Sequence, residues 1–173
     1  DFPGALEKFR QARALFKDPT EIGVCLIEQS HIHSLLGQSG SAIEVLREAQ
    51  EILPTERHEL RAEASFVLAR LLSGAAQFDE ALAQHIESKA YYEHKENLNL
   101  SDFYGFETWI QEKRSDFKAW ARAVRALVEI NPDKLALHRI PPNNERTRIR
   151  CENIVSELDL LIENSAEADN SWY

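Results

Sequence analysis

Residues 41–54 read SAIEVLREAQEILP, and this stretch decides the fold. Ala42, Leu46 and Ala49 place a small, a large and a small side chain on one side of a helix. Pro54 then ends the helix, because proline lacks the N–H that the helix ladder needs. Small residues at this spacing predict a helix that packs closely against a neighbouring helix.

The same pattern occurs four times along the chain. Besides the copy at residues 42–49, weaker copies are Ala5, Phe9 and Ala12; Ala81, His85 and Ser88; and Trp120, Val124 and Leu127. Successive copies start 37, 39 and 39 residues apart. A repeat of this length, filled with helix-forming residues, is typical of stacked helical hairpins.

The apolar periodicity predicts an all-α chain with no strands. We expect helices at residues 4–17, 20–36, 41–53, 55–74, 80–95, 102–114, 116–130 and 145–164, with Asp79 and Asp116 as N-caps of the fifth and seventh. The expected organisation is helical hairpins over residues 1–133 with an incomplete first repeat, a linker at 134–143, a capping helix at 144–165 and a mobile tail at 166–173. The last helix would seal the open end of the stack.

A second spacing brings in a known family. Ser30, Ala69 and Thr108 each lie 12 residues before the repeat anchors at 42, 81 and 120. With the turn region 77–81 and the repeat ending 126–133, this pattern resembles tetratricopeptide repeats over residues 4–133. The resemblance implies a right-handed α-α superhelix, a solenoid of antiparallel helical hairpins. Two features depart from the family: the period exceeds its usual length of roughly 34 residues, and Trp120 replaces a small anchor.

The resemblance also implies a concave binding groove, lined by the first helix of each hairpin. The positions that would face this groove are Ile27, His31, Phe66, Arg70 and Trp109, with Lys113 near its mouth. An aromatic residue, a cation and apolar neighbours are the composition of an interaction hot spot. The alternative interpretation is that Phe66 and Trp109 are core residues and Arg70 is a solvated cation. The Lys and Asn clamp with which some family members hold chaperone tails is not matched at Ile27 and His31.

Composition excludes several classes of protein. The chain has 173 residues and a net charge of −9, which disfavours nucleic acid as a partner. No apolar run reaches the roughly 20 residues of a membrane span, so no membrane partner is expected. Cys25 and Cys151 are the only cysteines and are far apart, which predicts reduced thiols and a cytoplasmic or nuclear location. The start at Asp1, without methionine, predicts a fragment of a longer protein.

No catalytic or metal-binding constellation is apparent. His31 and His33 are two residues apart, so a helix would point them in different directions. Glu56, Glu59 and Glu63 share a helix face that is expected to be solvated. We therefore expect no enzyme activity, no cofactor, no metal and no small-molecule substrate.

Two functional hypotheses follow. The first is a protein–protein interaction module, a scaffold that holds a peptide or partner helix in its concave groove. The alternative is a structural helical-repeat segment of a larger enzyme or regulator, such as the helical scaffold of a large kinase, with the groove filled by another part of the same chain. A third hypothesis, a small-ligand sensor, would require an enclosed pocket.

Overall fold

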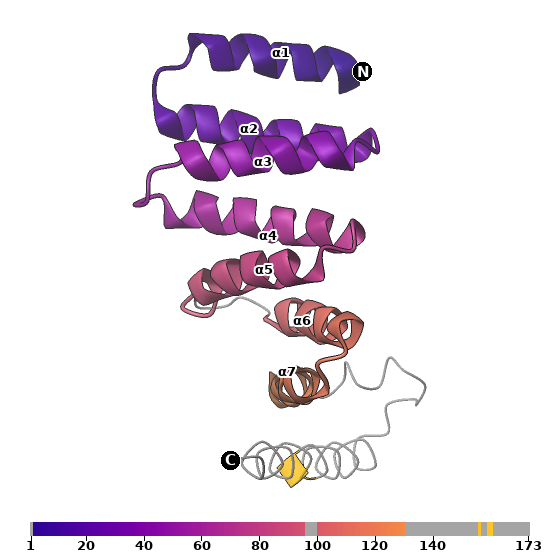
Figure 1. Cartoon of the computed structure of the whole chain (residues 1–173). Helices are drawn as coiled ribbons and strands as arrows, with labels where there is room; N and C mark the ends of the chain where they lie inside the picture. Colours follow the sequence, from indigo (N-terminus) through magenta and orange to yellow (C-terminus); the bar gives the residue numbers. More distant parts are fainter. Residues whose placement is uncertain (1, 96–99, 131–155, 157–158, 161–173) are drawn as a thin grey trace, which may run out of the picture. The chain divides into compact units, whose positions relative to one another are not determined.

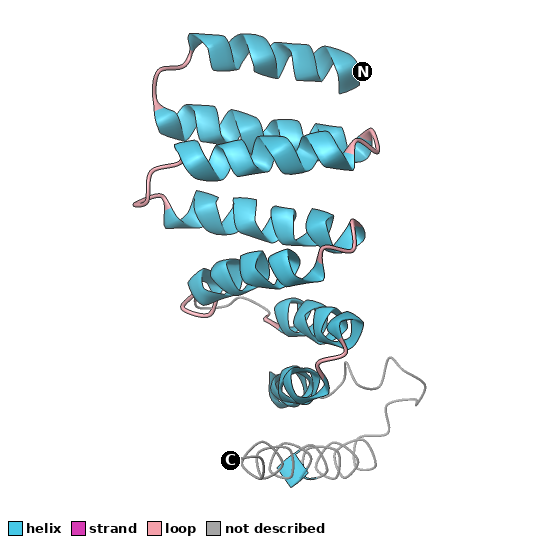
Figure 2. Ribbon diagram, in the orientation of Figure 1, coloured by secondary structure: helices cyan, strands magenta, loops and turns pink. Residues whose placement is uncertain are grey.

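The computed structural model describes residues 2–95, 100–130, 156 and 159–160, and this part of the chain is all-helical, with no strand (Figure 2). Its seven helices are α1 (Phe2–Leu15), α2 (Pro19–Leu35), α3 (Ser39–Ile52), α4 (His58–Gly74), α5 (Phe78–Tyr92), α6 (Ser101–Arg114) and α7 (Phe117–Ile130). The first seven expected helices are thus confirmed, with their ends shifted by a few residues.

Most of the C-terminal region lies outside the described residues. This applies to the expected linker at 134–143, to the tail at 166–173 and to nearly all of the expected capping helix at 144–165. Ser156, Asp159 and Leu160 are described and are helical.

The chain divides into two compact units, which are described separately. The first unit covers residues 1–98 and contains α1 to α5; the second covers residues 99–173 and contains α6 and α7. Within the first unit each helix packs on the next one in the chain, and α2 also contacts α4. The connections alternate between opposite ends of these helices, so neighbours run antiparallel (Figure 1). In the second unit α6 packs against α7.

The small residues of the repeat lie where helices meet. Ala42, Ala49 and Ala81 are completely buried, as are the expected crossing residues Ser30 and Ala69. The buried Ser30 hydroxyl donates to the Ile27 carbonyl at 2.6 Å, which satisfies its hydrogen-bonding need. Short side chains let the helix pairs α2–α3 and α4–α5 approach closely. The register inferred from the sequence is therefore confirmed for these two hairpins.

The hairpin turns repeat in detail. Gly37, Ala76 and Ser115, each 39 residues apart, all adopt a left-handed backbone, with φ of 72°, 59° and 58°. At each turn the next N–H bonds back to a carbonyl five residues earlier: Gln38 to His33, Gln77 to Leu72 and Asp116 to Gln111. This is the Schellman arrangement that ends a helix and reverses the chain. Three copies of one turn give three hairpins of the same geometry.

The two expected N-caps have different outcomes. The Ala119 N–H donates to the Asp116 carboxylate at 3.0 Å, so Asp116 caps α7 as expected. The expectation for Asp79 is wrong, because α5 begins at Phe78 and includes Asp79 in its first turn. At this position the carboxylate still favours the positive end of the helix dipole.

Candidate binding face

One side of α2 exposes a row of mixed side chains. Val24, Glu28, His31 and Leu35 are spaced four, three and four residues apart, which places them in one line along the helix. Val24 is 39% exposed and Leu35 is 67% exposed. Large aliphatic side chains left in water at two points of one line are typical of a contact surface.

A corresponding row runs along α4. It consists of Glu59, Glu63, Phe66 and Arg70, and Glu63 and Arg70 lie 39 residues after Val24 and His31. The Arg70 guanidinium lies over the Phe66 ring, 5.8 Å from the ring centre, so the aromatic side chain orients the cation. Because α2 and α4 contact each other and their rows occupy equivalent positions, we treat the rows as one surface. This surface is called the α2/α4 face: Val24, Glu28, His31, Leu35, Glu59, Glu63, Phe66 and Arg70.

Polar side chains of α1, α3 and α5 are bonded to one another. Arg13 of α1 forms an ion pair with Glu48 of α3. Arg47 of α3 pairs with Glu80 of α5 at 2.6 Å, and Gln50 of α3 donates to Gln84 of α5 at 2.6 Å. In contrast, no ion pair between α2 and α4 is found among the residues that the structure describes. The α2/α4 face therefore keeps more of its bonding capacity available.

The structure corrects one predicted groove residue. Ile27 is only 2% exposed, so its side chain belongs to the core and offers no surface to a partner. Its counterpart Phe66 is half-buried, Arg70 is exposed, and His31 is half-exposed with Nδ1 3.8 Å from the Glu28 carboxylate. His31, Phe66 and Arg70 thus share the α2/α4 face.

The two remaining predicted groove residues lie on α6, in the second unit. Trp109 is 37% exposed and its ring stacks on Phe106, with ring centres 6.0 Å apart. Lys113 is exposed in the last turn of α6. Each is available to solvent, and we describe them separately from the α2/α4 face.

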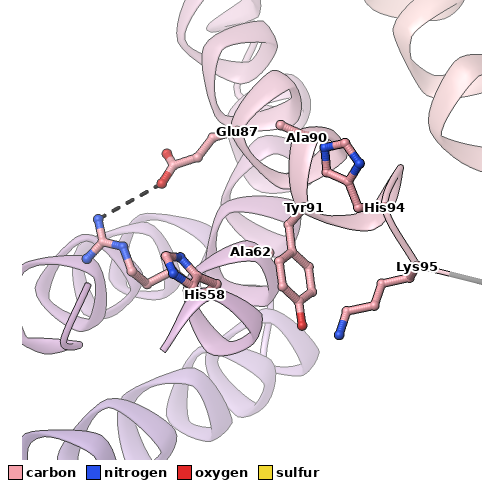
Figure 3. Close-up of a pocket in the computed structure, with 8 residues that line it drawn as sticks. His58, Ala62, Glu87, Ala90, Tyr91, His94 and Lys95 are labelled. Carbon is pink, nitrogen blue, oxygen red and sulfur yellow. Dashed lines mark ion pairs between the residues drawn. The ribbon is translucent and has the colours of Figure 1, made fainter. Parts of the chain in front are cut away.

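A pocket of about 570 Å³ lies within the first unit, between the start of α4 and the end of α5 (Figure 3). Its lining residues are His58, Arg61, Ala62, Glu87, Ala90, Tyr91, His94 and Lys95. An adjoining hollow of about 520 Å³ shares His58, Tyr91 and Lys95 and adds residues 56, 57, 59 and 60. Both hollows have charged walls of mixed sign.

The charged groups of this pocket are partly engaged within the protein. Arg61 donates to the Gln50 and Leu53 carbonyls at 2.8 and 3.1 Å, which ties the end of α3 to α4. The same guanidinium lies 3.9 Å from the Glu87 carboxylate. The Lys95 ammonium lies 4.8 Å from the centre of the Tyr91 ring, and a hydrogen bond to Tyr91 raises the pKa of Lys95. We assign Arg61 a structural role.

Sequence reasoning missed this pocket as a site. His58 and His94 were considered singly, since 36 residues separate them. A usable signal was the spacing of Glu87, Ala90, Tyr91 and His94, which places them on one side of a helix. The pocket also needs the antiparallel pairing of α4 and α5, and a single helix pattern does not contain that information.

Other site chemistry is limited in the part of the chain that is described. Cys25 is a buried free thiol, and burial raises its pKa, so it is held in the unreactive protonated form. Among the described residues, no group of three or more His, Cys, Asp or Glu side chains is arranged to hold a metal ion. None of the described helices is long and apolar enough to cross a membrane.

Comparisons with protein-family models, with curated proteins and with solved structures give no match to this chain. Its functional interpretation therefore depends on the residues and contacts described above.

Proposed function

We propose that this chain is a protein–protein interaction module that holds a peptide or a partner helix on its α2/α4 face. The observation that carries the proposal is the contrast between its two surfaces. Side chains of α1, α3 and α5 bond to one another across helices. The α2/α4 face instead exposes Val24, Leu35 and an arginine stacked on Phe66.

The fold proposed for this role is a right-handed tetratricopeptide-like solenoid, in which α2 and α4 are the first helices of successive hairpins. The repeated hairpin turns at Gly37, Ala76 and Ser115 support such a regular stack. In a solenoid of this kind the first helices line the concave surface. The proposed role is non-enzymatic, and the reduced-thiol argument from the sequence favours the cytoplasm or nucleus.

The proposal is tested with peptides selected from a random displayed library against the immobilised chain. Binding of the selected peptides is measured by fluorescence anisotropy to wild type and to Leu35→Ala, Phe66→Ala and Arg70→Ala. We expect each substitution to weaken binding by about tenfold, equal to about 1.4 kcal/mol, because central contacts carry most of the affinity.

Matched controls use the same residue types away from this face. Leu15→Ala and Arg10→Ala alter exposed side chains of α1 and should leave the affinity unchanged. Circular dichroism of every variant checks that the helices are retained. Selected peptides that bind all α2/α4 variants as tightly as wild type would contradict the proposal.

A further inference from the structure

The charge of the α2/α4 face narrows the kind of partner that it fits. Resting on the function proposed above, we infer that this face takes a basic amphipathic segment. Its apolar side chains would pack on Val24, Leu35 and Phe66. Its lysine or arginine side chains would lie against the carboxylates beside them.

The first support is the balance of charges. Glu28, Glu59 and Glu63 supply three carboxylates, whereas Arg70 supplies the single guanidinium of the face. Arg70 is held over Phe66 and forms no ion pair with any described residue. An acidic partner would meet repulsion from three positions, and a basic one from one position. Complementary charge therefore selects a cationic segment.

The second support is that these carboxylates are weakly neutralised within the protein. Neither Glu59 nor Glu63 forms an ion pair with a Lys or Arg in the described part of the chain. Burial raises the pKa of the Tyr92 phenol, and the carboxylates of Glu63 and then Glu59 raise it further. Their negative field thus reaches a neighbouring helix. Lys95 also responds to Glu59, so Glu63 and Glu28 are the better acids to test.

The third support is that the acids alternate with apolar side chains. Glu28 lies between Val24 and His31 in the α2 row, and Glu63 lies one turn before Phe66 in the α4 row. A partner with only positive charges would leave Val24 and Leu35 in water. An amphipathic segment covers both kinds of group, which is how a helix recognises an extended surface.

Two synthetic helical peptides test the inference. They share the same leucine positions, and one carries lysine and the other glutamate at every polar position. Anisotropy titrations at pH 7.5 use the whole chain. We expect the lysine peptide to bind at least tenfold more tightly, with an affinity that falls as salt is raised. Glu28→Gln and Glu63→Gln should each weaken it by about threefold, as expected for exposed ion pairs.

Control variants separate this face from the general attraction of a chain with net charge −9. Glu44→Gln and Glu51→Gln remove the same charge from exposed positions of α3 and should leave the affinity for the lysine peptide unchanged. Equal losses from both pairs, or equal affinity for the two peptides, would overturn the charge inference. If Leu35→Ala weakens the binding of neither the lysine nor the glutamate peptide, the proposed function itself fails.

Discussion

At the scale of single residues, Gly23 sets the distance between α2 and the end of α3. A Cβ at this position would lie 2.3 Å from Leu53 Cδ2, and Leu53 is only 3% exposed. A buried leucine has little room to move, because protein interiors are close-packed. Glycine is thus needed here for space, in the middle of a helix where alanine would otherwise be preferred.

Gly23→Ala should therefore destabilise the first unit. Overpacking of a core costs about 1–3 kcal/mol, and the better helix propensity of alanine offsets up to about 1 kcal/mol. We expect a net loss of about 1–2 kcal/mol in the free energy of unfolding, measured by urea denaturation. Gly105→Ala is the control, since no atom lies within 4 Å of its added Cβ, and it should be neutral or stabilising. Equal effects of the two substitutions would contradict this account.

At the scale of elements, the three hairpin turns show one backbone geometry with three different residues. Gly37 suits the left-handed position, whereas Ala76 and Ser115 adopt it against their steric preference. The repeated Schellman hydrogen bonds hold the chain in this conformation. Local strain is thus accepted to keep each second helix antiparallel to the first.

Ala76→Gly should stabilise the α4–α5 hairpin by about 0.5–1 kcal/mol, because it relieves the strain of a left-handed alanine. The reverse change, Gly37→Ala, should cost a similar amount. Both are measured as shifts in the urea midpoint. Ala75→Gly is the matched control: its φ is −89°, so glycine relieves no strain there. A lower midpoint for Ala76→Gly would show that the turn is not strained.

At the scale of the whole molecule, the chain consists of two compact units with their own buried residues. Leu26, Leu46, Leu68 and Leu72 are fully buried in the first unit, and Ile110 is fully buried in the second. The first unit also contains the complete α2/α4 face. The proposed binding surface therefore needs only the helices α1 to α5.

Residues 1–98 expressed alone should fold cooperatively and bind the lysine peptide like the whole chain. Thermal unfolding followed by circular dichroism tests the first expectation, and anisotropy tests the second. Leu68→Ala in this fragment should cost about 2–5 kcal/mol, since it leaves a cavity in the core. A gradual, non-cooperative loss of helix would show that the first unit does not fold by itself.

The helices and the small-residue register were predictable because both depend on local spacing. Apolar residues every three to four positions specify a helix face wherever the segment lies in the fold. The buried positions of Ser30 and Ala69 followed from this spacing. The N-cap at Asp79 was misplaced because α5 begins before it, and helix ends depend on turn geometry that periodicity does not contain.

The sequence by itself determined an all-helical chain and a 39-residue register of hairpins. Only the tertiary structure decided which residues of that register reach solvent. Ile27 and Phe66 occupy the same position in successive repeats, yet one is core and the other lies on the α2/α4 face. Likewise, His58 and Tyr91 line one pocket only because α4 and α5 pair antiparallel. Helix formation is local, whereas exposure depends on what neighbouring helices cover.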